Sequence, residues 1–97
     1  MAAYLIASIT VTDPVLYETY RAQVPPVIAR LGGRYVVRGG AVSKVEGDLN
    51  LDRVVVLEFD TREAAQAFCD SPDYAPLAAI RQAATRTHSV IVDGYTP

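Results

Sequence analysis

Residues 31–40 read LGGRYVVRGG, and two glycine pairs in this stretch enclose a predicted five-residue strand. The first pair suits the left-handed conformation that ends a helix, because glycine has no Cβ atom to clash. The second pair favours a sharp turn out of the strand. In a regular strand, Tyr35 and Val37 lie on one face, and the other face carries Arg34, Val36 and Arg38. Charged groups that alternate with valine indicate a wet cavity, an ion pair or a sheet edge.

The bulk composition predicts one globular domain over residues 1–97, since 51% of the residues are hydrophobic and 21% are charged. The net charge is −2 and no basic stripe is present, which argues against nucleic-acid binding. The single cysteine, Cys69, excludes an internal disulfide and fits a reducing compartment. No signal-peptide pattern or membrane-length apolar run occurs, so we expect a cytoplasmic protein without a membrane partner.

The first half of the chain predicts a strand followed by a helix. Residues 4–11 (YLIASITV) form an apolar run typical of a strand covered on both faces. Asp13 can cap a helix that begins at Pro14 and keeps an apolar period as far as Gly32. The Pro25-Pro26 pair interrupts this period, so we expect two helical pieces, at residues 14–23 and 25–31, set at an angle.

The second half predicts two further strands and more helix. Residues 41–46 indicate a weak strand or irregular edge, and residues 53–59 (RVVVLEF) indicate the strongest strand of the chain. Asp60 has the position of a capping residue for the next helix, and helical turns restart at Ser71-Pro72 and at Pro76. Residues 87–92 form the last predicted strand.

The order of these elements predicts an α+β domain with a ferredoxin-like βαββαβ plan and an antiparallel sheet. Its own helices cover one face of such a sheet. The predicted strands are apolar on both faces, so the second face requires a partner. A second copy of the chain, packed sheet against sheet, gives a homodimeric barrel.

The chain resembles the bacterial family known as domain of unknown function 1330, within the dimeric α+β barrel superfamily. The resemblance covers nearly the whole chain and depends on the residues Thr12-Asp13-Pro14, Tyr17, Tyr20, Gly32 to Gly40, Glu46-Gly47, Val54 to Phe59, Ser71-Pro72-Asp73-Tyr74 and Arg81. It implies the dimeric barrel fold and no established activity, because the superfamily includes cofactor-free monooxygenases, isomerases, haem enzymes and binding domains. Cys69 stands where the family usually has an aromatic residue.

Arg81 is the strongest candidate for a binding residue. It shares a helical stripe with apolar residues and therefore faces the sheet, where a guanidinium needs an anion or several carbonyl groups. An ion pair with Glu58 and an anion-binding role both fit. Arg38 and Glu58 end apolar strands with the same alternation, so they can also share a face. Either they form an ion pair, or Arg38 orients an oxygen atom while Glu58 acts as a base.

Other candidates are tyrosines and the single histidine. The tyrosines Tyr17, Tyr20, Tyr35 and Tyr74 combine aromatic faces with polar tips, which suits a pocket lining as well as a core. His88 has no ligand partner at metal-binding spacing, so we expect no metal or cofactor and regard His88 as an exposed residue or a proton carrier.

Two functions remain open at this point. The first is binding of a small anionic or carbonyl-bearing metabolite between sheet and helices by Tyr17, Tyr20, Arg38, Tyr74 and Arg81. The second is cofactor-independent catalysis by an isomerase or monooxygenase-like enzyme, in which Arg38 or Arg81 stabilises an enolate and Glu58 or His88 carries the proton. The sequence does not decide whether the chain is an enzyme.

Overall fold

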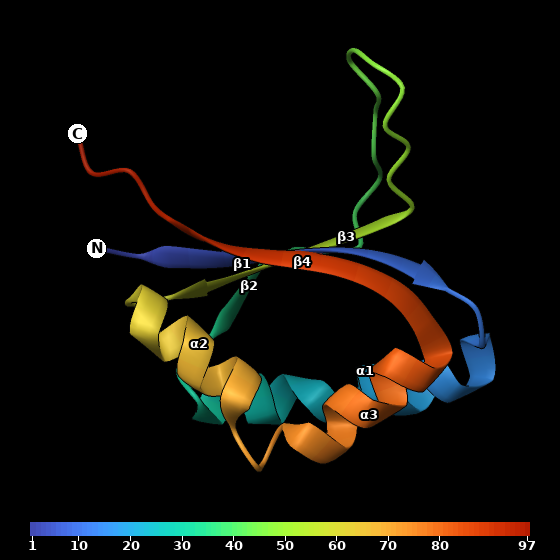
Figure 1. The fold of residues 1–97 in the computed structure, drawn as a ribbon, viewed down its shortest axis with the longest axis horizontal. Coiled ribbons are helices and arrows are strands. Elements are labelled where there is room, and N and C mark those ends of the chain that lie inside the picture. Colours follow the sequence, from blue (N-terminus) through green and yellow to red (C-terminus); the bar gives the residue numbers. More distant parts are fainter.

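The fold is a four-stranded antiparallel sheet with three helices on one face (Figure 1). The computed structural model describes residues 1–97. The elements are β1 (Ala3–Val11), α1 (Pro14–Arg30), β2 (Arg34–Arg38), β3 (Arg53–Phe59), α2 (Arg62–Asp70), α3 (Ala75–Ala84) and β4 (Thr85–Asp93). The strand order is β2-β3-β1-β4, which confirms the predicted ferredoxin-like plan, with two helices in the second crossover.

The core lies between the sheet and the helices. Strand β1 is central and pairs with both β3 and β4, so that Leu5 lies opposite Leu57 and Ile91. The Phe59 side chain is fully buried, and its ring centroid lies 5.5 Å from that of Phe68. No helix is long and apolar enough to cross a membrane.

Helix α1 is a single helix, so the prediction of two pieces is wrong. It begins as predicted, with the Asp13 side chain accepting a hydrogen bond from the Leu16 amide at 3.0 Å. Pro25 and Pro26 each lack an amide hydrogen and remove a helical hydrogen bond. The helix continues because the residues on both sides of the pair, Val24 and Ile28, are buried in the core. The burial of these two side chains outweighs the free energy that is lost with the two helical hydrogen bonds.

Strand β2 contains a bulge that changes which side chains share a face. Tyr35 lies opposite Leu57, but Val37 lies opposite Val56 and Arg38 opposite Val55, which leaves Val36 without a partner. Tyr35 and Arg38 therefore both lie on the helix-covered face, and the predicted pairing of Tyr35 with Val37 is wrong. The Arg38 guanidinium carbon is 4.8 Å from the Tyr35 ring centroid.

Two further expectations need correction. Residues 41–46 form no strand and belong to a long loop that projects from the sheet (Figure 1), where Val45 and Leu49 are exposed. The cap of α2 is Thr61, whose hydroxyl accepts from the Ala64 amide at 3.0 Å. The residue predicted as the cap, Asp60, instead accepts a hydrogen bond from Arg34.

The second face of the sheet has no helix over it (Figure 1) and carries exposed aliphatic residues beside polar ones. Ile6 lies opposite Val56 on one side and Val90 on the other, which makes an aliphatic row across three strands. Near one end of this face, Glu58 accepts hydrogen bonds from Arg34 at 2.7 Å and from the Tyr4 hydroxyl at 3.1 Å. We call it the uncovered face.

The end of α1 generates a stability prediction. A Cβ atom at Gly33 would lie 2.8 Å from the Phe59 ring and 2.9 Å from Ile28, so Gly33→Ala forces the core apart. We expect a loss of about 1–3 kcal/mol in the free energy of unfolding, measured by urea denaturation. Gly40→Ala is the matched control, because a Cβ atom there meets nothing within 4 Å. Equal stability of the two variants would contradict the prediction.

Candidate functional site

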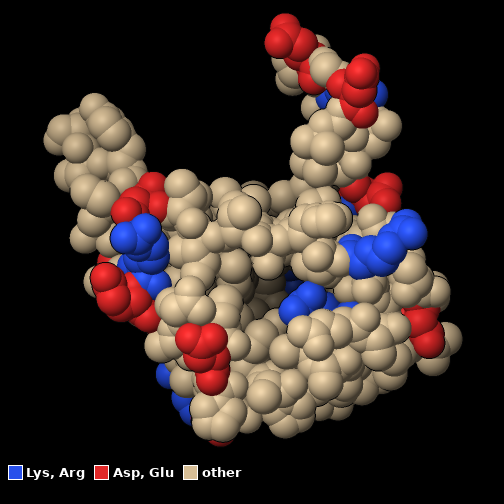
Figure 2. All heavy atoms as spheres, viewed as in Figure 1, with Lys and Arg blue, Asp and Glu red and all other residues tan.

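A pocket of about 230 Å³ lies between the sheet and the helices, and Figure 2 shows it as a hollow with basic side chains at its edge. The sheet side of the pocket is apolar and consists of Leu5, Ala7, Ile9, Val55 and Leu57. The helix side is mainly aromatic and includes Tyr17, Tyr20, Phe68 and Tyr74. Apolar walls with a few polar groups are typical of a small-molecule site.

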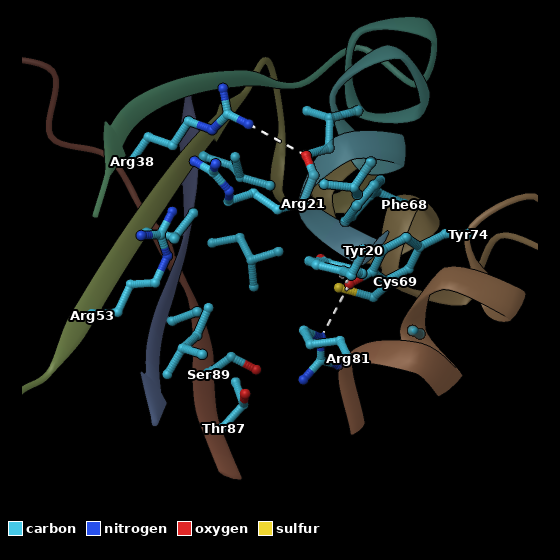
Figure 3. Close-up of a pocket in the computed structure, with 18 of the residues that line it drawn as sticks. Tyr20, Arg21, Arg38, Arg53, Phe68, Cys69, Tyr74, Arg81, Thr87 and Ser89 are labelled. Atoms are coloured by element: carbon cyan, nitrogen blue, oxygen red, sulfur yellow. Dashed lines mark hydrogen bonds between the residues drawn. The ribbon is translucent and has the colours of Figure 1, made fainter. Parts of the chain in front are cut away.

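Four arginines line this pocket, and no aspartate or glutamate does. Arg38 ends β2 and Arg53 begins β3, so antiparallel pairing brings them to the same side, while Arg81 comes from α3 (Figure 3). The fourth, Arg21, is paired with Glu18 at 3.0 Å. None of the ion pairs in the structure includes Arg38, Arg53 or Arg81. These three guanidiniums keep a net positive charge in the pocket.

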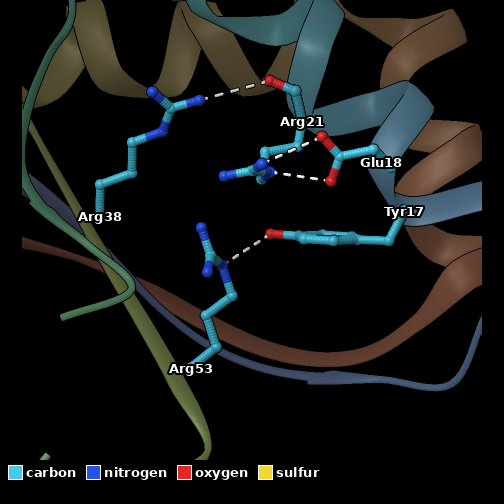
Figure 4. A network of polar contacts seen from close by, with 5 residues as sticks. All are labelled: Tyr17, Glu18, Arg21, Arg38 and Arg53. Atoms are coloured by element: carbon cyan, nitrogen blue, oxygen red, sulfur yellow. Dashed lines mark hydrogen bonds and ion pairs between the residues drawn. The ribbon is translucent and has the colours of Figure 1, made fainter. Parts of the chain in front are cut away.

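Arg53 is held in place by two contacts. Its Nε donates to the Tyr17 hydroxyl at 3.0 Å, which leaves both terminal nitrogens without an acceptor (Figure 4). Its guanidinium also packs against Gly39, where a Cβ atom would collide with it. Gly39 has a φ of +69°, so glycine is favoured there on backbone grounds as well.

Arg38 is held by a carbonyl that the helix does not use. Its Nη2 donates to the Arg21 backbone oxygen at 3.4 Å (Figure 4). In a regular helix this oxygen would accept from the amide of residue 25, but Pro25 has no amide hydrogen. The proline that the sequence marked as a helix breaker therefore frees an acceptor for a pocket arginine.

At the other end of the pocket, Arg81 belongs to a buried phenol network. Its Nε donates to the Tyr74 hydroxyl at 3.3 Å, and the Tyr74 and Tyr20 hydroxyls are 2.9 Å apart. Burial and the neighbouring Tyr74 hydroxyl raise the pKa of Tyr20 far above its usual value, so its phenol stays neutral. Cys69 lines the pocket beside this network, and burial raises the pKa of its thiol.

The structure brings together the ligand-binding candidates and separates the two catalytic ones from them. Tyr17, Tyr20, Arg38, Tyr74 and Arg81 all line the pocket. Glu58 instead lies on the uncovered face and pairs with Arg34, so the predicted pairs with Arg38 and Arg81 are wrong. His88 lies between two pocket residues, Thr87 and Ser89, on β4, and alternation turns it to the uncovered face, where it is exposed.

Sequence reasoning missed Arg53, Arg21, Thr87 and Ser89 as pocket residues. Arg53 had one usable signal, because it begins a strand that pairs antiparallel with the strand ending at Arg38. Thr87 and Ser89 also had a usable signal in the sequence, since they lie on either side of His88 in a predicted strand and therefore share the face opposite to it. Arg21 gave no sequence signal that separates it from an ordinary surface arginine of a helix.

Solved structures share this fold. A protein of unknown function from Rhodopseudomonas palustris, RPA0582, is 21% identical with a TM-score of 0.79, over 99% of this chain and 84% of that chain. SnoaB, a cofactor-independent oxygenase from Streptomyces nogalater, is 16% identical with a TM-score of 0.68, over 99% and 95%. Rv0793 from Mycobacterium tuberculosis is 17% identical with a TM-score of 0.63, over 100% and 98%. SnoaB and Rv0793 have the dimeric α+β barrel fold, and this chain has the same α+β architecture.

The family comparison agrees with the resemblance seen in the sequence. The family model described as "Domain of unknown function (DUF1330)" matches residues 2–95. No curated protein matches the sequence of this chain. The identities to the solved structures are low, so these likenesses show a common fold and nothing about activity.

The phenol network generates a pH prediction. The fold raises the pKa of Tyr20, so its contribution to stability is complete below the unfolded value of about 10 and is lost as the pH rises above it. We expect the urea midpoint of the protein to fall between about pH 9 and pH 11, and Tyr20→Phe to flatten this decline. The exposed Tyr95→Phe is the control and keeps the full decline. An unchanged pH dependence in Tyr20→Phe would disprove this role for Tyr20.

Proposed function

We propose that this chain, which belongs to the DUF1330 family of unknown function, binds a small carboxylate or similar oxyanion with an apolar body. One observation carries the proposal: Arg38, Arg53 and Arg81 face an aromatic pocket without a carboxylate partner. Arg53 and Arg81 are partly removed from water and lose hydration, which an oxyanion restores through charge-assisted hydrogen bonds, whereas Arg38 is exposed at the edge of the pocket. An oxyanion is therefore the ligand that suits this charge.

The size of the pocket supports a small ligand. An apolar cavity of about 150 Å³ is large enough for benzene. The pocket here measures about 230 Å³, which suits one ring with substituents. Five aromatic side chains around the pocket provide flat surfaces for such a ring, namely Tyr17, Tyr20, Tyr35, Phe68 and Tyr74.

The enzymatic alternative has less support in this chain. SnoaB is an oxygenase that needs no cofactor, and Arg38 or Arg81 could stabilise an enolate in a related reaction. Proton transfer requires a base within hydrogen-bond reach of the ligand. Glu58 and His88 lie on the opposite face of the sheet, and the pocket lining contains no Asp, Glu or His. Binding is therefore the better supported function.

A second copy of the chain is the partner that best fits the uncovered face. No helix covers the aliphatic row centred on Ile6, and Val90 remains 61% exposed. Monomeric proteins rarely leave a large contiguous apolar patch in water. Two copies packed sheet against sheet cover it with one self-complementary interface. The pocket lies on the other side of the sheet and stays accessible in such a dimer.

Arg53 provides the direct test of the oxyanion site. We expect the protein to bind benzoate in isothermal titration calorimetry, and Arg53→Gln to weaken this binding by about tenfold or more through loss of a charge-assisted hydrogen bond. Arg62→Gln is the control, because Arg62 is exposed on α2 and lies outside the pocket. Unchanged benzoate affinity in Arg53→Gln would count against the site.

The dimer is tested on the uncovered face. We expect light scattering at micromolar concentration to give the mass of two chains for the wild-type protein and of one chain for Val90→Asp, because a buried unpaired carboxylate is costly. Val15→Asp is the control, since Val15 is 84% exposed on α1. A wild-type monomer would contradict the proposal.

A further inference from the structure

The sheet side of the pocket changes in character from one edge to the other. Two rows of residues cross it, as fixed by the strand register. The first row, from β2 to β4, is Arg38, Val55, Ala7 and Ser89. The second row, from β3 to β4, is Arg53, Ile9 and Thr87. Each row begins with a guanidinium, continues over aliphatic side chains and ends with a hydroxyl.

Arg81 lies above the hydroxyl end of these rows. Helix α3 leads directly into β4, and the Thr85 hydroxyl donates to the Arg81 carbonyl oxygen at 2.7 Å. Figure 3 shows the Arg81 side chain toward Thr87 and Ser89, on the other side of the pocket from Arg38 and Arg53. The pocket therefore has donors at both ends and apolar walls between them.

The donors at the Arg81 end are not used up inside the protein. Arg81 donates from Nε to Tyr74, and its terminal nitrogens have no acceptor. Thr87 is bonded to Thr85, whereas the Ser89 hydroxyl has no partner within the chain. A ligand with one polar group would cover the terminal nitrogens of Arg81 without accepting from them, whereas Ser89 on the edge strand stays exposed. The unsatisfied donors there would then weaken its binding.

The length of the rows limits what lies between the two ends. Arg38 and Ser89 are three strand spacings apart, roughly 14 Å between Cα atoms. The side chains of Arg38 and Arg81 occupy part of this distance, one at each end of the pocket. The remaining apolar stretch over Ala7 and Val55 has room for one six-membered ring with a group at each end, in agreement with the pocket volume of about 230 Å³.

We infer that the ligand is a single-ring aromatic acid with a second oxygen substituent across the ring from its carboxylate. The carboxylate lies between Arg38 and Arg53, the ring lies over Ala7 and Val55, and the second oxygen accepts hydrogen bonds from Arg81. This assignment rests on the proposed oxyanion site and adds a second polar contact, at the Arg81 end of the pocket. Hydroxybenzoates and benzene dicarboxylates are the corresponding chemical classes.

The test compares benzoate, 4-hydroxybenzoate and terephthalate by isothermal titration calorimetry. We expect the wild-type protein to bind at least one of the two-ended acids about tenfold or more tightly than benzoate, because a site with a matching donor discriminates against a ligand that lacks the acceptor. In Arg81→Gln this preference falls to about twofold or less, since a neutral amide replaces the guanidinium. Arg62→Gln keeps the full preference. Ser89→Ala, a smaller change, reduces the preference in part.

The outcomes separate this inference from the proposed function. If all three acids bind with equal affinity and Arg53→Gln weakens each of them, the oxyanion site stands and the two-ended ligand is wrong. If the preference for a two-ended acid survives in Arg81→Gln, Arg81 does not recognise the second oxygen. If none of the three acids binds at millimolar concentration, both the aromatic acid and the benzoate site are disproved.

Discussion

The pairing of β1 with strands on both of its edges is the constraint on which the pocket depends. Hydrogen bonds to β3 and to β4 fix one register across the sheet, so that Ala7 lies between Val55 and Ser89. Because side chains alternate, this register decides at once which residues face the helices and which face away. Guanidiniums at one edge, hydroxyls at the other and aliphatic side chains between them all follow from it. The helices then close the pocket with aromatic side chains.

The sequence predicted the elements well where local chemistry decides them. Asp13-Pro14 marked the start of α1, and the apolar runs marked β1 and β3. The sequence-based prediction failed where the structure of an element depends on contacts between residues distant in the sequence. The Pro25-Pro26 pair alone predicts a break, but core packing on both sides of it keeps one helix. The helical hydrogen bond lost at Pro25 leaves the Arg21 carbonyl oxygen free to accept from Arg38.

The candidate site was predicted in part for a similar reason. Strict alternation put Arg38 on the same face as Glu58, and one extra residue in β2 separates them. The bulge contains no glycine, so nothing in the sequence of β2 indicated that the alternation of side chains is interrupted there. Arg53 was missed for another reason, because its place in the pocket depends on the paired strand and on Gly39 rather than on its own neighbours.

The bulge at Val36 also bears on how such a pocket can change during evolution. The bulge, and not only residue identity, decides whether Arg38 points into the pocket or toward the uncovered face. If β2 kept all its residues and paired regularly, Val36 would lie opposite Val56, Val37 opposite Val55, and Arg38 would point to the uncovered face. Loss of Val36 itself would restore a regular ladder and leave Arg38 opposite Val55, on the pocket side. Related chains can therefore differ in ligand preference through the presence or absence of this bulge, even where every arginine is retained.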